Sequence, residues 1–219
     1  AADSLSDLYL TLKGETVTNP TFPPLTTGTT VTPGVYSTAA AVTPTGVVTL
    51  DGLNQVDPVF IFEITGALTV AASAQFILTN GATANNIFWV SDGACSLGAN
   101  SDCFGTFISL VANTVGNNCV LTGRVLSLGG AIANSGDVSI PATGSQFDLG
   151  YVERFALFTS AGALSNSGGG NTITGDIGTN LGAITGWNNA TINGNTYNNT
   201  SEILITMTGG GVRIVEITI

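Results

Sequence analysis

The chain has 219 residues, only 8% of them charged, and its 14 acidic and 4 basic residues give a formal net charge of −10. So few basic residues cannot neutralise the phosphates of a nucleic acid or an anionic membrane surface, so neither is an expected partner. Hydrophobic residues make up 43%, but no apolar run approaches the ~20 residues of a membrane helix, so we expect no membrane insertion.

The first predicted element is an amphipathic helix within residues 1–18. Leucines recur there at helical spacing, Asp3 or Ser4 is the expected N-cap, and Gly14 is a natural stop. A helix this short is marginal alone in water, so we expect it to pack along one side of the remaining fold. The chain begins with Ala1 rather than Met, as a processed secreted protein would.

A short pattern then repeats along the chain. Each copy has Ala, usually an apolar residue, then Thr, Ser or Ala, and two positions later a further small residue, as in Ala-Leu-Thr-Val-Ala at 67–71. Six copies start at intervals of about 18 to 32 residues, and two other types of strand fill each interval. Three short strands per turn are typical of a β-solenoid. We therefore predict an all-β dominated fold, an irregular right-handed β-solenoid of triangular cross-section with one long α-helix packed alongside.

Alternation of side chains along each strand predicts which residues of the repeat point outward. The inward positions carry mostly apolar residues, whereas the outward ones form a flat grid of small side chains without charge. The outward positions are Thr43, Thr45, Thr69, Ala71, Ser73, Ser96, Gly98, Asn100, Thr114, Gly116, Asn118, Ala133, Ser135, Ser165 and Ser167. Stacked strands lie about 4.7–4.9 Å apart, so this grid is regular in two directions.

We interpret the whole chain, 1–219, as one domain. The flanking helix is expected in 1–18, the solenoid coils in 29–178, and a cap with a C-terminal hairpin in 179–219. The hairpin prediction rests on two strand-like runs around a Gly turn in 202–219.

The three cysteines are expected to have structural roles. Cys95 takes an inward position of the repeat and is predicted to be a buried thiol. Cys103 and Cys119 lie near neighbouring corners of successive coils and are our predicted disulfide pair. Because the chain has no C-x-x-C motif and no His, we expect no metal site.

Enzymatic chemistry finds little support in the sequence. The absence of His excludes Ser-His-Asp and Cys-His sites. Most acidic residues fall at predicted corners, where Asp commonly forms turns, and no basic residue stands beside clustered acids. We therefore expect no enzyme and no cofactor, and an enzyme acting on polysaccharide is the weakest of the alternatives.

Several stretches together resemble the microbial ice-binding protein family: "TPGVYS", "VFIFEITGALTVAASAQFILTNGATANNIFWV", "GTFISL", "TGRVLSL" and "FALFTSAGALSNSGGGNTITGDIGTNLGAITGW". The resemblance covers nearly everything except residues 179–219. It implies an irregular β-solenoid with a flanking helix, whose flat face adsorbs to an ice crystal surface and inhibits ice growth and recrystallisation. Carried over residue by residue, that face matches the outward grid. The resemblance also favours a secreted protein, which we expect to be a monomer.

The order of the motifs departs from the family. In its usual arrangement the portion that begins here with "FALFTSAG" precedes the helix, whereas in this chain it comes last. The chain is therefore interpreted as a circular permutation, or as a cut across the boundary of tandem domains. The alternative function is an extracellular adhesion or surface-structural module, because a solenoid face of low charge suits that role as well.

Overall fold

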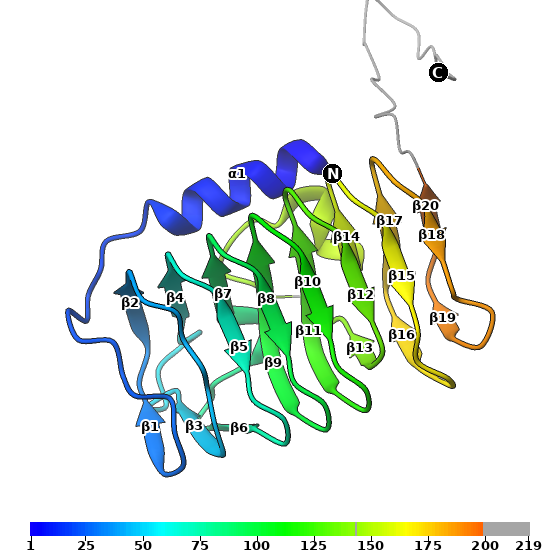
Figure 1. Ribbon diagram of the computed structural model, residues 1–219. Coiled ribbons are helices and arrows are strands. Elements are labelled where there is room, and N and C mark those ends of the chain that lie inside the picture. The colour runs from blue at the N-terminus through cyan, green and yellow to red at the C-terminus, as the bar shows by residue number, and fades with distance from the viewer. Residues whose placement is uncertain (143, 199–219) are drawn as a thin grey trace, which may run out of the picture.

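The computed structural model describes residues 1–142 and 144–198. Its strands pair in parallel and stack as successive coils, and most coils contribute one strand to each of three faces. Figure 1 shows this stack with α1 lying along it. A parallel stack of this kind is the β-solenoid that the repeat predicts.

The first face is the one that the helix covers. Its strands are β2 (Gly34–Thr38), β4 (Phe60–Ile64), β7 (Ile87–Ser91), the later halves of β9 (Asp102–Ser109) and β11 (Val120–Ser127), β14 (Phe155–Thr159), β17 (Asp176–Thr179) and β20 (Thr196–Asn198). Short 3₁₀ turns, η1 (Ala84–Asn86) and η2 (Gly150–Arg154), precede β7 and β14.

The second and third faces carry no helix among the described residues. The second face is a separate six-stranded sheet of β5 (Leu68–Val70), β8 (Cys95–Leu97), β10 (Asn113–Val115), β12 (Ile132–Asn134), β15 (Leu164–Asn166) and β18 (Ile184–Thr185). The third face has β1 (Thr29–Val31), β3 (Val47–Asp51), β6 (Gln75–Thr79), the first parts of β9 and β11, β13 (Asp137–Ser139), β16 (Thr172–Thr174) and β19 (Thr191–Asn193).

Register between coils places like side chains above one another inside the solenoid. Tyr36, Phe62, Trp89 and Phe107 are successive register partners, and their rings stack with interplanar angles of 14°, 9° and 11°. Trp89 is 1% exposed, and its indole N–H donates to the Phe104 carbonyl at 3.0 Å. The core therefore holds a continuous aromatic column that fixes the register and makes the stack rigid.

Helix α1 spans Ala2–Lys13, shorter than the predicted segment 1–18. Leu5, Leu8 and Leu12 are buried against the first face, and Gly14 ends the helix as expected. The predicted N-cap is wrong: Ala1 takes that position, and no side chain caps the helix. The C-terminal half of the helix is held to the solenoid by Asp92. The Tyr9 hydroxyl donates to Asp92 Oδ1 at 2.7 Å, and Lys13 Nζ lies 3.1 Å from the same oxygen.

The coils continue beyond residue 178, where the sequence analysis places the start of a cap. Strands β18, β19 and β20 pair with β15, β16 and β17, so the coiled part includes residues as far as 198, the last described residue. The predicted hairpin in 202–219 lies outside the described residues. Within the described part of the chain, no helix is long and apolar enough to cross a membrane.

All three cysteines are free and buried in the structure, which does not contain the predicted disulfide between Cys103 and Cys119. In the parallel register, Cys103 lies opposite Leu121, two residues beyond Cys119. The two cysteines are therefore diagonal neighbours, with Cα atoms about 8 Å apart for ordinary strand spacings. A disulfide needs Cα atoms closer than about 7 Å, so the backbone would have to move to form it.

Candidate functional site

A column of small outward residues runs along the strands of the second face. Successive register partners place Thr69 beside Ser96, Ser96 beside Thr114, and so on along the sheet. The full column is Thr69, Ser96, Thr114, Ala133, Ser165 and Thr185. Backbone hydrogen bonds between 42–44 and 67–71 extend the face to the preceding coil. Hydroxyls and methyl groups therefore recur at each strand spacing, about 4.8 Å apart.

Every residue predicted to point outward on this face is at least partly accessible. Thr69, Thr114 and Ala133 are exposed in the centre of their strands, and none of the fifteen predicted residues is buried. The Ser135 and Ser167 hydroxyls hydrogen-bond each other at 2.7 Å across adjacent coils. The structure thus brings all fifteen residues to one side of the solenoid.

Three of the fifteen residues lie at the border of the face rather than on its flat part. Ser73, Asn100 and Asn118 have positive φ values of 58°, 57° and 55°, in the left-handed region that turns require. The Asn118 side-chain amide also donates to Asn100 Oδ1 at 3.2 Å. These residues therefore turn the chain toward the third face, and this role alone accounts for the preference for Asn.

Two glycines keep the coils close together beside this border. A Cβ atom added to Gly98 would lie 2.5 Å from the backbone of Ala71 and Ala72, and one added to Gly116 would lie 2.6 Å from Ala99 N. Neither position accepts a side chain without displacing the neighbouring coil. Gly98 and Gly116 therefore help to keep the second face flat.

The inner side of the second face is more polar than the side-chain alternation predicts. Asn113, Asn134 and Asn166 point inward and are at most 5% exposed. Asn113 Nδ2 donates to the Leu126 carbonyl at 3.0 Å, and Asn134 Nδ2 donates to Asn166 Oδ1 at 3.1 Å. These hydrogen bonds satisfy the Nδ2 donors and link Asn134 to Asn166 of the next coil, whereas Asn113 Oδ1 and Asn134 Oδ1 have no partner among the described residues.

Charge separates the second face from the third. The second-face strands and their flanking repeat residues contain no charged residue. The third face, by contrast, carries the partly exposed carboxylates of Asp51, Asp102 and Asp137, and exposes Ile77 and Val120. Of the two faces without a helix, only the second presents a uniform array of small side chains.

Thr185 is a member of the outward column that the sequence analysis missed. It is exposed and pairs with Ser165 in the last coil. The signal was present, because Ala-Ile-Thr-Gly at 183–186 repeats the pattern of the earlier coils. Placing the end of the coils at 178 excluded it.

The chain belongs to the ice-binding-like family, whose sequence profile matches residues 1–138, from α1 into β13. An ice-binding protein of Nostoc sp. strain HG1 is 34% identical over 113 residues, which are 52% of this chain and 40% of that protein. Ice-binding protein 1 of Shewanella frigidimarina is 42% identical over 101 residues, 45% of this chain and 11% of that protein. The chain thus matches less than half the length of these curated relatives.

Solved structures agree with the family assignment. The ice-binding protein of the Antarctic ascomycete Antarctomyces psychrotrophicus superposes with a TM-score of 0.60 at 30% identity, over 65% of this chain and 70% of that chain. The ice-binding protein of an Antarctic Flavobacteriaceae bacterium superposes with a TM-score of 0.58 at 33% identity, over 91% of this chain and 50% of that chain. The β-solenoid with a flanking helix is therefore shared with ice-binding proteins.

Proposed function

We propose that this protein binds ice through the second face and thereby inhibits ice growth and recrystallisation. The observation that carries the proposal is the in-register outward column from Thr69 to Thr185 on a sheet free of charge. Membership of the ice-binding-like family supports the same target. Ice is thus the proposed partner, and the activity needs no catalytic group.

The physical basis of adsorption is a rigid array of weak contacts. Methyl groups and regularly placed hydroxyls hold water in an arrangement that merges with the ice lattice, whereas charged groups would impose hydration shells of their own. Each contact contributes little, so the array binds only if its members are already in place before binding. The aromatic column on the inner side of the first face, which stacks four successive coils, and the close approach at Gly98 support that rigidity.

Replacing Thr69 by Tyr tests this face. The bulky ring would stand above a flat array and keep neighbouring coils away from ice, so we expect Thr69→Tyr to lose most of its thermal hysteresis. Ala71→Tyr should act in the same way, because it projects from the same strand segment. Circular dichroism and melting temperature of Thr69→Tyr should stay close to the parent values, since Thr69 is exposed.

Thr49→Tyr is the matched control on the third face. Thr49 is an outward, partly exposed position of β3, and it pairs with Thr30 and Ile77 in adjacent coils. We expect full hysteresis from this variant. Loss of activity in Thr49→Tyr together with full activity in Thr69→Tyr would place the ice-binding face on the third face instead.

We further infer that the protein works outside the cell as a monomer. Bulk ice forms in the water around cells, and a second copy docked on the second face would cover the array. A circular permutation, or a cut across tandem domains, accounts for the order of the motifs and also for a family match that stops at residue 138. Intact mass of the natural product and light scattering of the purified chain test these inferences.

A further inference from the structure

A cavity of about 600 Å³ lies away from the second face. It is found where the chain between β13 and β14 departs from the regular coil. Strand β11 pairs with β13 up to Thr122 and with β14 from Val125 onward, so the ladder is interrupted between these two positions. The segment that follows β13 leaves the solenoid there and returns through η2. Ile140, Pro141 and Tyr151 from this segment form the apolar part of the cavity wall.

Arg124 lines the same cavity from β11. It is 3% exposed, and its Nε and Nη2 atoms donate to the Glu153 carbonyl at 2.9 and 2.8 Å. Its buried Nη1 has no hydrogen-bond partner among the described residues. One edge of the guanidinium thus holds η2 in place, and the other edge keeps unused donors.

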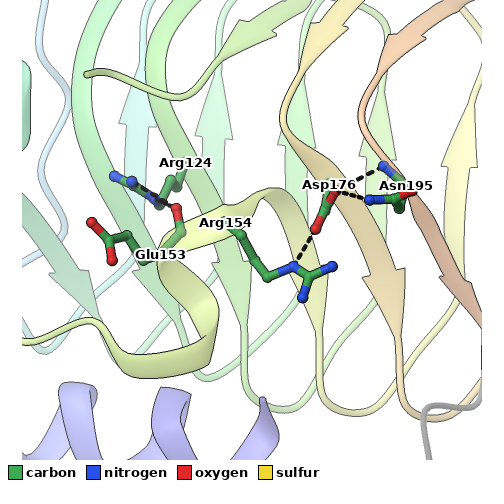
Figure 2. A network of polar contacts seen from close by, with 5 residues as sticks. All are labelled: Arg124, Glu153, Arg154, Asp176 and Asn195. Carbon is green, nitrogen blue, oxygen red and sulfur yellow. Dashed lines mark hydrogen bonds and ion pairs between the residues drawn. The ribbon is translucent and has the colours of Figure 1, made fainter. Parts of the chain in front are cut away.

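The remaining charges around the cavity are either paired or repel an anion. Arg154 forms an ion pair with Asp176 and lies 4.6 Å from the centre of the Tyr197 ring. Figure 2 shows its guanidinium turned toward Asp176, while Arg124 reaches the Glu153 main chain. Glu153 lines the cavity, and its side chain is exposed. Burial lowers the pKa of Arg124 to about 10, and the charge of Glu153 counteracts part of that effect.

We propose that this cavity binds a small carboxylate with an apolar body, whose oxygens pair with the free edge of the Arg124 guanidinium. A guanidinium edge matches a carboxylate in two parallel hydrogen bonds, which a single ammonium does not. The volume lies within the range of small-molecule sites, and Ile140 and Pro141 suit an apolar body. The net charge of −10 disfavours anions elsewhere on the surface. This site is independent of ice binding.

Benzoate and its uncharged analogue benzamide are the probes. We expect saturation-transfer NMR and titration calorimetry to show benzoate bound at least about tenfold more tightly than benzamide. Glu153→Gln should strengthen benzoate binding, because it removes the repelling carboxylate and keeps the carbonyl that holds Arg124. Arg124→Lys should weaken it by about tenfold or more, because Lys lacks the second pair of donors.

Tyr151→Glu is a second variant that tests the same cavity if Arg124→Lys does not fold. Tyr151 is 70% exposed at the cavity, so a new carboxylate there should repel benzoate without disturbing the core. Equal binding of benzoate and benzamide, or unchanged benzoate binding in Tyr151→Glu, would overturn the proposal. Uptake of the same variants into ice should equal that of the parent, so failure of this site and failure of ice binding are separate results.

Discussion

Glu63 is a buried carboxyl group beneath helix α1. It is 6% exposed, and its Oε1 has no hydrogen-bond partner in the described part of the chain. Burial raises the pKa of Glu63, while Lys13 and a hydrogen bond from Ser37 lower it. A raised pKa means that the folded state holds the proton more tightly than the unfolded state does. Its contribution to stability is therefore present below the unfolded pKa of about 4.3 and is lost as pH rises through the folded pKa.

Glu63→Gln should therefore stabilise the protein at neutral pH. The amide keeps the shape of the side chain and removes the buried charge, so we expect a gain on the order of 1 kcal/mol in the free energy of unfolding. Below pH 4 the carboxyl of Glu63 is neutral, and the difference between variant and parent should vanish. Urea denaturation at pH 7.5 and pH 3.5 measures both values, and a variant less stable than the parent at pH 7.5 would refute the argument.

The three thiols give a second test at the level of single residues. Burial raises the pKa of Cys95, so its reactive thiolate is disfavoured, and Cys103 and Cys119 are 0% exposed. We expect Ellman's reagent to react with none of them in the folded protein and with all three after unfolding in guanidinium chloride without reductant. One reactive thiol after unfolding would mean that the other two are joined in a disulfide.

Helix α1 is held at the first face by a narrow apolar stripe. Leu8 is 2% exposed and belongs to the cluster between the helix and the sheet, whereas Leu10 on the same helix is 63% exposed. Leu8→Ala should lower the free energy of unfolding by about 2–5 kcal/mol, because it leaves a cavity. Leu10→Ala is the matched control and should change it by less than about 0.5 kcal/mol. Chemical denaturation compares the two, and similar losses would contradict the packing described for α1.

The elements of this fold differ in how far the sequence predicts them. Alternation and the repeat predict the second-face strands and their outward residues, because side-chain period and burial decide both. The inward amides of Asn113 and Asn134 break that pattern, because hydrogen bonds from their Nδ2 atoms to main-chain carbonyls hold them at positions where apolar residues are expected. The sequence pattern also does not predict the register offset between Cys103 and Cys119, because that offset depends on the conformation of the turn before each strand of the third face.

The cavity beside Arg124 shows a different limit of sequence-based prediction. A lone Arg in an apolar strand carries no local signal, and its partner, the Glu153 carbonyl, lies 29 residues further along the chain. Only the path of the chain between β13 and β14 brings the two together. Similarly, Ser73 and Asn100 are predicted on the flat part of the second face but lie at its border, because both residues adopt left-handed turn conformations.

At the scale of the whole molecule, we expect a bulky substitution to reduce ice binding most when it lies at the centre of the second face. Strand β10 lies inside the six-stranded second face, whereas β5 lies at its edge. Thr114→Tyr interrupts contact on both sides, so we expect it to reduce thermal hysteresis more than Thr69→Tyr does. Hysteresis at equal protein concentration compares them. A larger loss from Thr69→Tyr would mean that the coils near the first turns form most of the ice contact.

Ice binding by the unaltered chain is the most direct test of the account. The purified protein is mixed with a non-binding reference protein, an ice hemisphere is grown slowly from the solution, and the fraction of each protein in the ice is measured. We predict enrichment of this chain in the ice relative to the reference, with shaped crystals in a hysteresis reading of the same sample. Exclusion of a folded, β-rich sample from the ice would contradict the account and favour an adhesion or surface-structural module.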